Sequence, residues 1–91
     1  MFVGKVVGTV VATQKDERLV GWKLLIVRPL DPHKPLHDKI PQVAVDIVCA
    51  GMGETVLVAE GSSARHAVAQ PDAPIDAVIV GIVDTLEVQE P

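Results

Sequence analysis

Two adjacent serines, an arginine and a histidine lie within the stretch AEGSSARHAV, residues 59–68, and are the first candidates for chemistry. A lipase-type serine nucleophile needs the pattern G-x-S-x-G, because the second glycine lets the helix pack closely on the preceding strand. Arg65 occupies the position of that glycine, and His66 is too near in sequence for a helix to turn it toward Ser63. The stretch instead predicts a short helix whose first turn is capped by the hydroxyl of Ser62 or Ser63.

The stretch AGMGET, residues 50–55, is the second candidate, because glycine-rich turns can bind phosphate groups. A phosphate-binding loop leads from a strand into the N-terminus of a helix, whereas this one leads into the β-rich run TVLVAE. A hairpin turn that needs a positive φ angle explains the glycines better. We therefore expect Gly51, Gly53 and Glu54 to shape a turn rather than to bind a cofactor.

Metal binding has little support in the sequence. His33 and His37 have the i, i+4 spacing of a helical zinc pair, but Pro35 lies between them. Since proline interrupts a helix, the segment 29–41, which holds four of the seven prolines, is predicted to be a surface loop. We expect no metal site.

Three carboxylates, those of Asp46, Asp76 and Asp84, lie at or inside apolar runs. One of them could form an acid–base pair with His66 if the fold brought the two together. Buried carboxylates more often accept hydrogen bonds from backbone N–H groups or pair with an arginine, here Arg28 or Arg65. We favour this structural role, and we expect neither a cofactor nor enzymatic activity.

The size and composition of the chain predict an oligomer. Its 91 residues predict one domain, 1–91, and a domain of that size hides only about 60–65% of the surface of its unfolded chain. Yet 48% of the residues are hydrophobic and only 22% are charged. No apolar run approaches the roughly 20 residues of a membrane-spanning helix, and the N-terminus does not resemble a secretory signal. We expect an obligate oligomer that buries the surplus apolar surface between subunits.

The net charge limits which classes of partner are expected, and the cysteine content indicates the cellular compartment. The net charge is −4, with acidic and basic residues mixed along the chain, which argues against nucleic-acid or membrane partners. Cys49 is the only cysteine, so no intrachain disulfide can form and a cytoplasmic location is consistent. We expect its thiol to be buried.

The elements that must position these residues are mostly strands, because valine and isoleucine occur in short runs throughout. The runs predict strands at 2–13, 22–29, 42–49, 55–60 and 77–88, with the short helix between the fourth and fifth. Glycines inside the first and last strands, such as Gly8 and Gly81, predict bulges or sharp bends. The predicted fold is mainly β, a small five-stranded OB-like barrel with one α-helix.

Such a barrel has one rival function, that of an OB-like module that binds a small ligand or nucleic acid. These modules stack bases on aromatic side chains and line their groove with basic residues. Phe2 and Trp22 are the only aromatic residues here, and the chain is acidic overall. This alternative therefore has weak support.

The order of the motifs closely resembles the bacterial microcompartment vertex proteins of the EutN/CcmL type, which occur in carboxysomes and metabolosomes. Three stretches carry the resemblance, namely GKVVGTVVATQKDERLVGWKLLIVRPL, VAVDIVCAGMGETVLVAEGSSAR and IDAVIVGIVDTLEV. They cover nearly all of the chain, except the loop 31–41 and the last residues. One departure is Cys49, which stands where many family members have glycine.

The resemblance implies a non-enzymatic shell protein that assembles as a homopentamer. It further implies a place at the fivefold vertices of a polyhedral shell in the cytoplasm, beside hexameric shell proteins. The motifs lean toward a metabolosome. We hypothesise that the glycine turn (Gly51, Gly53 and Glu54) and the helix start (Ser62, Ser63 and Arg65) contribute to the subunit interface or border a central pore. Arg65 would anchor a carboxylate or carbonyl at or near that interface.

Overall fold

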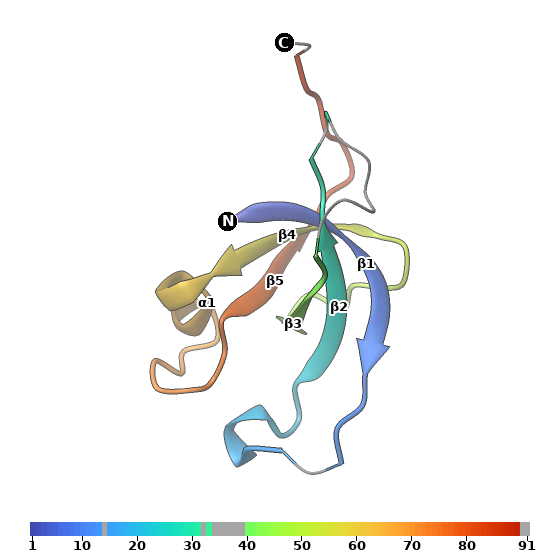
Figure 1. The fold of residues 1–91 in the computed structure, drawn as a ribbon. Helices are drawn as coiled ribbons and strands as arrows, with labels where there is room; N and C mark the ends of the chain where they lie inside the picture. The colour runs from blue at the N-terminus through green and yellow to red at the C-terminus, as the bar shows by residue number, and fades with distance from the viewer. Residues whose placement is uncertain (14, 32, 34–39, 90–91) are drawn as a thin grey trace.

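Five short strands close into a barrel with one α-helix at its side (Figure 1). The computed structural model describes residues 1–13, 15–31, 33 and 40–89. The predicted mainly-β fold, with its helix between the fourth and fifth strands, is confirmed. Along the chain the elements are β1 (Phe2–Val10), the 3-10 turn η1 (Glu17–Leu19), β2 (Lys23–Pro29), β3 (Gln42–Asp46), β4 (Thr55–Glu60), α1 (Gly61–Ala67) and β5 (Ala77–Ile82).

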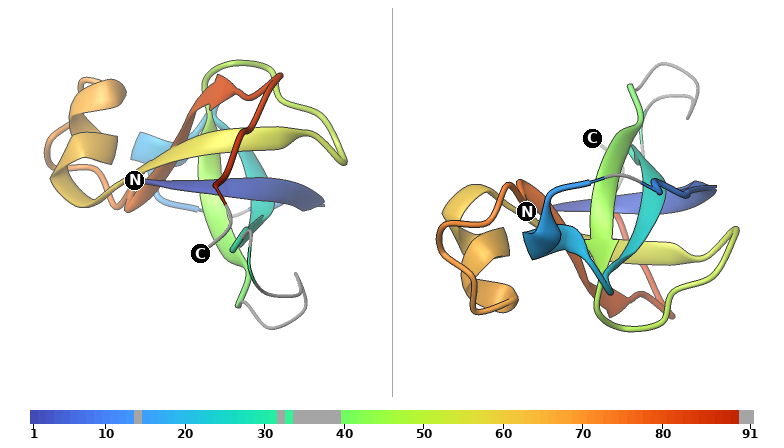
Figure 2. Two further views of the ribbon diagram at one scale, coloured as in Figure 1. Left: turned by 90° about the horizontal axis from the view of Figure 1, so that it is seen from above. Right: turned by 90° about the horizontal axis from the view of Figure 1, so that it is seen from below.

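The strands follow the order β1-β2-β3-β5-β4 around the barrel. All neighbours are antiparallel except β3 and β5, which run parallel and pair only at Val45 with Val78 and at Asp46 with Ile79. Parallel neighbours need a long crossover, and here it passes through β4 and α1. The helix therefore packs outside the barrel against β4 and β5, as both views in Figure 2 show.

Alternation along the strands divides the apolar side chains between two clusters. The inner cluster fills the barrel, and its buried members from β1, β2, β4 and β5 include Val6, Leu25, Val27, Val56, Val58 and Ile79. The outer cluster lies beneath the helix and joins β3 and β5 to α1 through Val45, Val78, Ala64, Val68 and Ile75. On β2, Leu24 and Ile26 point away from the inner cluster and are only half-buried in the isolated subunit.

Two glycines of β1 have the roles that their position predicts. The pairing of β1 with β2 shifts register between Val6 and Gly8, which is the predicted bulge. At Gly4 the two strands approach so closely that an added Cβ would collide with the side chain of Val27. Near Gly81, the pairing of β4 with β5 shifts register in the same way. The bulges bend the ribbon enough to close a barrel of only five strands.

Three strands end earlier than the apolar runs predict, namely at Val10, Asp46 and Ile82. At the end of β3, the Asp46 carboxylate accepts hydrogen bonds from the N–H groups of Val48 and Ala50, so these groups are lost to a strand ladder. Most of the predicted surface loop, including Pro35 and His37, lies outside the described residues. The prediction for that loop and for its histidine pair therefore stays a prediction.

Candidate functional site

The helix start does not form the predicted serine cap. The N-cap residue of α1 is Glu60, whose side chain makes no capping hydrogen bond, and Ser62 and Ser63 lie exposed in the first turn. Gly61 takes a positive φ of 61° and donates its N–H to the Asp76 carbonyl at 2.9 Å. The prediction is wrong because this glycine turns the chain into the helix one residue before the serines.

No nucleophilic site forms on the helix. Ser62, Ser63 and His66 are exposed, and no hydrogen bond or ion pair joins them within the described residues. Arg65 is half-buried and donates from Nη1 to the Ile75 carbonyl at 3.1 Å. Its partner is thus a carbonyl of its own subunit, and this bond ties α1 to the loop that leads into β5.

The glycine turn connects β3 with β4, but these strands are not neighbours in the barrel, so the predicted hairpin is wrong. The turn instead pairs with β1, because Gly53 N–H donates to the Val6 carbonyl at 2.9 Å and Val6 N–H donates to the Glu54 carbonyl at 3.0 Å. Gly53 has the predicted positive φ, 82°. The Glu54 carboxylate accepts from the Gly51 N–H, which closes the turn upon itself. The hydrogen bonds of Gly51, Gly53 and Glu54 therefore fix the conformation of this turn.

Asp46 has the structural role that the sequence analysis favoured, but with a different cation. Its side chain is 1% exposed and accepts from Val48 N–H at 3.0 Å and from Ala50 N–H at 2.9 Å. Lys23 Nζ lies 3.7 Å from the carboxylate and donates to the Ala50 carbonyl at 2.7 Å. The expected arginine partners are not used, because the register of β2 with β3 puts Lys23 opposite Asp46.

The two other carboxylates lie outside β5 and are exposed, so the role of a buried structural carboxylate that was expected for them is wrong for both. Asp76 precedes the strand and Asp84 follows it. Neither forms a hydrogen bond or an ion pair with His66, and within the described ranges no cluster of histidine, cysteine or carboxylate side chains could hold a metal ion.

Cys49 is exposed, and the prediction of a buried thiol is wrong. The residue has a φ of 60°, in the left-handed region that favours glycine. This conformation directs the backbone from Asp46 into the glycine turn and leaves the side chain outside the core. The backbone thus explains why glycine is the expected residue at this position.

The turn between β1 and β2 carries the shortest ion pair among the described residues, between Arg18 and Asp16. Arg18 binds the Asp16 carboxylate through Nε at 2.9 Å and Nη2 at 2.8 Å, and its N–H donates to the same side chain. These side-chain and backbone hydrogen bonds from Arg18 lower the pKa of Asp16 to about 2. The hydrogen-bonded Asp16 carboxylate in turn raises the pKa of Arg18. Arg18 also reaches the Asp72 carbonyl and so joins this turn to the loop after α1.

Apolar side chains remain exposed over much of the molecule, as the composition predicts. The large ones are Met1, Val11, Val20, Ile40, Val43, Ile47, Met52, Ile82, Leu86 and Val88. Two grooves accompany them, of about 330 Å³ beside the ends of β1 and β2 and about 210 Å³ between β3 and the loop before β5. Leu24 lines both grooves, so they share one wall. In the part of the chain that is described, no helix is long and apolar enough to span a bilayer.

A family model described as "Ethanolamine utilisation protein EutN/carboxysome" matches residues 1–84. The bacterial microcompartment shell vertex protein GrpN of Rhodospirillum rubrum is 53% identical over 87 residues, 96% of this chain and 97% of its own length. The corresponding protein PduN of Salmonella typhimurium is 48% identical over 91 residues, 94% of this chain and 98% of its own length.

Solved structures agree with these matches. That of GrpN, described as a pentameric microcompartment shell protein from Rhodospirillum rubrum, is similar with a TM-score of 0.79 and 49% identity, over 99% of this chain and all of the other. That of Gloeobacter violaceus CcmL has a TM-score of 0.84 and 40% identity, over 97% of this chain and 90% of the other. Both curated relatives are named as shell vertex proteins, which are structural and not enzymatic. The chain belongs to the EutN/CcmL family of bacterial microcompartment shell vertex proteins.

Proposed function

We propose that the chain assembles as a homopentamer that occupies the fivefold vertices of a microcompartment shell. The observation that carries this proposal is the match to the pentameric shell protein GrpN over 99% of the chain. The exposed apolar side chains add independent support, because they give each subunit a surface to bury against its neighbours. A ring needs heterologous contacts, in which two different surfaces of the subunit meet.

The function of such a ring is geometric. Hexamers alone tile a flat layer, and a fivefold unit in place of a sixfold one introduces the curvature that closes a polyhedron. The partners of the pentamer are therefore hexameric shell proteins of the same compartment, and no nucleic acid, membrane or cofactor takes part. We infer a metabolosome as the enclosing compartment, and the 53% identity to the vertex protein GrpN, against 49% to the carboxysome vertex protein CcmL of Synechocystis, supports this.

Within the ring, we place the glycine turn and the helix start at the subunit interface or the central pore. Gly53, Ser62 and Ser63 are exposed in the isolated subunit and therefore accessible to a neighbour. Gly51 and Glu54 hold the shape of the turn through their mutual hydrogen bond. Arg65 positions the helix start indirectly, because its hydrogen bond to the Ile75 carbonyl fixes the helix relative to the following loop.

The experiment that tests the pentamer is a mass measurement by native mass spectrometry. The expected species has five times the 9.7 kDa mass of one subunit at micromolar concentration. A monomer or dimer that remains folded and soluble at this concentration overturns the proposal. Co-expression with hexameric shell proteins tests the vertex role, because omission of the pentamer should convert closed polyhedra into open or elongated shells.

Arg65→Ala tests the role of the helix start, and Arg65→Lys is its matched control because lysine retains a positively charged donor group. We expect the alanine variant to dissociate at a higher protein concentration than the wild type, while the lysine variant lies between them. An alanine variant whose pentamer is as stable on dilution as the wild type removes Arg65 from the proposed interface.

A further inference from the structure

The C-terminal segment leaves the barrel with its apolar side chains uncovered. Val83 N–H donates to the Thr55 carbonyl at 2.8 Å, which fixes the point where the chain departs from β4. Residues 84–89, here called the C-terminal arm, are all exposed and make no hydrogen bond within the described part of the chain. Leu86 and Val88 of this arm are 50% and 44% exposed. Figure 1 shows the arm running away from the barrel.

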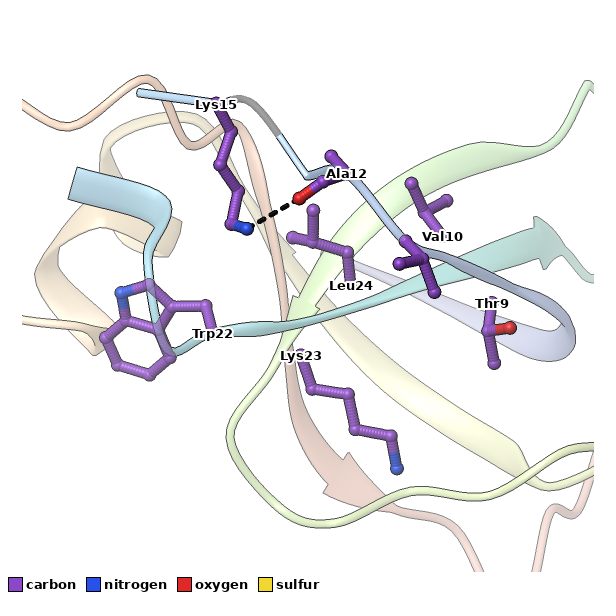
Figure 3. Close-up of a pocket in the computed structure, with 8 residues that line it drawn as sticks. Thr9, Val10, Ala12, Lys15, Trp22, Lys23 and Leu24 are labelled. Carbon is purple, nitrogen blue, oxygen red and sulfur yellow. Dashed lines mark hydrogen bonds between the residues drawn. The ribbon is translucent and has the colours of Figure 1, made fainter. Parts of the chain in front are cut away.

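The end of β1 and the start of β2 lie at the opposite end of the molecule from the arm (Figure 1). Residues of these two segments line the groove of about 330 Å³. It is called here the β1–β2 groove. Its lining is mainly apolar and includes Val10, Val11, Trp22 and Leu24, and the side chain of Val11 is 88% exposed. In Figure 3 the Lys15 ammonium turns to the Ala12 carbonyl, which it binds at 2.7 Å, and leaves the apolar wall open.

Beside this groove, β1 has an unpaired edge. The strand β4 pairs with β1 only from Phe2 to Lys5, and the glycine turn covers Val6. From Val7 to Val10, β1 pairs with β2 alone among the described strands. An edge of this kind presents N–H and C=O groups to which another extended segment can add.

We propose that the C-terminal arm of one subunit lies in the β1–β2 groove of the next subunit around the ring and pairs with the free edge of β1. This inference rests on the proposed pentamer. Leu86 and Val88 are two residues apart, so an extended arm presents both on one face, toward Val11 and Trp22. Six extended residues span about 20 Å, which exceeds the roughly 13 Å of a four-residue edge.

Two further observations identify the occupant as the arm of a second copy. The arm and the groove lie at opposite ends of the barrel, so an arm that runs away from its own subunit meets the groove of another (Figure 1). A contact between two different surfaces of identical subunits is heterologous, which is the kind that closes a ring. The charges also match, because the arm carries Asp84 and Glu87 without a cation, and Lys15 lines the groove with only a backbone carbonyl as its partner among the described residues.

Disulfide trapping tests the contact directly. The double variant Leu86→Cys and Val11→Cys is made in a Cys49→Gly background, which removes the native thiol. Both sites are exposed, so the subunit folds in either case. Under mild oxidation we expect most of the protein to become a ladder from covalent dimer to pentamer on a non-reducing gel. The matched control, Thr85→Cys with Val11→Cys, places the arm thiol on the opposite face and should give little ladder.

The outcomes separate this inference from the proposed function. A pentameric wild type without a ladder in the double variant overturns the arm contact and leaves the pentamer intact. A fast-migrating cross-linked monomer also overturns it, because the arm then reaches its own groove. A wild type that is not a pentamer overturns both. As a second measurement, Leu86→Ser should raise the concentration at which the pentamer half-dissociates roughly tenfold, and an unchanged value contradicts the contact.

Discussion

The barrel interior and the C-terminal arm contain the same kinds of side chain in opposite surroundings. Leu25 and Val27 are completely enclosed by the strands, whereas Leu86 and Val88 stand in the open. Burial of an apolar side chain stabilises whichever contact removes it from water. The interior residues therefore determine whether the subunit folds, and the exposed ones are available to determine whether subunits associate. Substitutions in the two regions should separate these effects.

The largest expected effect is that of Leu25→Ala, because it opens a cavity in the closed barrel. We expect the free energy of unfolding to fall by about 3 kcal/mol. The matched surface variant, Val11→Ala, should change the stability of the isolated subunit by less than about 0.5 kcal/mol. Urea denaturation at subunit concentrations below the dissociation range of the ring measures both values. Equal losses in the two variants would contradict the division between core and surface.

A smaller effect is expected for Asp46→Ala, which removes the only carboxylate buried among the described residues. The N–H groups of Val48 and Ala50 lose their acceptor, and Ala50 is fully buried. We expect a loss of about 2 kcal/mol in thermal or chemical unfolding. Asp46→Asn retains one acceptor oxygen and should lose about half as much. If alanine and asparagine destabilise equally, the charge opposite Lys23 matters more than these hydrogen bonds.

Cys49→Gly should stabilise the subunit, because glycine adopts the left-handed φ of 60° without steric cost. The expected gain is about 0.5–1 kcal/mol in the same unfolding measurement. The control Cys49→Ala removes the thiol and retains the Cβ atom, so it should give no gain. Stabilisation by alanine equal to that by glycine would show that the thiol, not the backbone, is unfavourable here.

The smallest effect concerns the exposed pair of Asp16 and Arg18. The pKa of Asp16 is lowered from 3.8 to about 2 in the folded state by the hydrogen bonds from Arg18. A lowered pKa contributes stability that is present above pH 3.8 and is lost as the pH falls through about 2. NMR titration of the Asp16 carboxyl should give the low midpoint, and Arg18→Gln should return it toward 3.8. An unchanged midpoint in that variant would exclude Arg18 as the cause.

Predictions from the sequence succeeded where one short stretch determines the outcome. The run 55–60 is β4 at the predicted residues, and a short helix follows it as expected, although its N-cap is Glu60, two residues before Ser62. The positive φ at Gly53 also follows from the local pattern. The serine cap failed because the residue that turns the chain, Gly61, draws its hydrogen-bond partner from Asp76, fifteen positions away. No pattern within the helix sequence contains that information.

The candidate site likewise combines features that the local sequence predicts with features that depend on distant residues. The excess of apolar residues predicts an associating surface, but not that Val11 and Leu86 lie at opposite ends of the barrel. The three carboxylates at 46, 76 and 84 look alike in sequence, and only the register of β2 with β3 buries the first of them beside Lys23. The backbone also decides the exposure of Cys49, because its left-handed φ turns the chain out of the core.

The amino-acid sequence alone was therefore sufficient to establish the β-rich elements, the short helix after β4 and the surplus of apolar surface. These properties arise from the conformational preferences and the hydropathy of neighbouring residues. The folded structure decided that β3 pairs with β5 rather than β4, which carboxylate is buried, and where the free edge of β1 lies. Such features depend on hydrogen bonds between residues far apart in the chain, and those partners exist only after the barrel has closed.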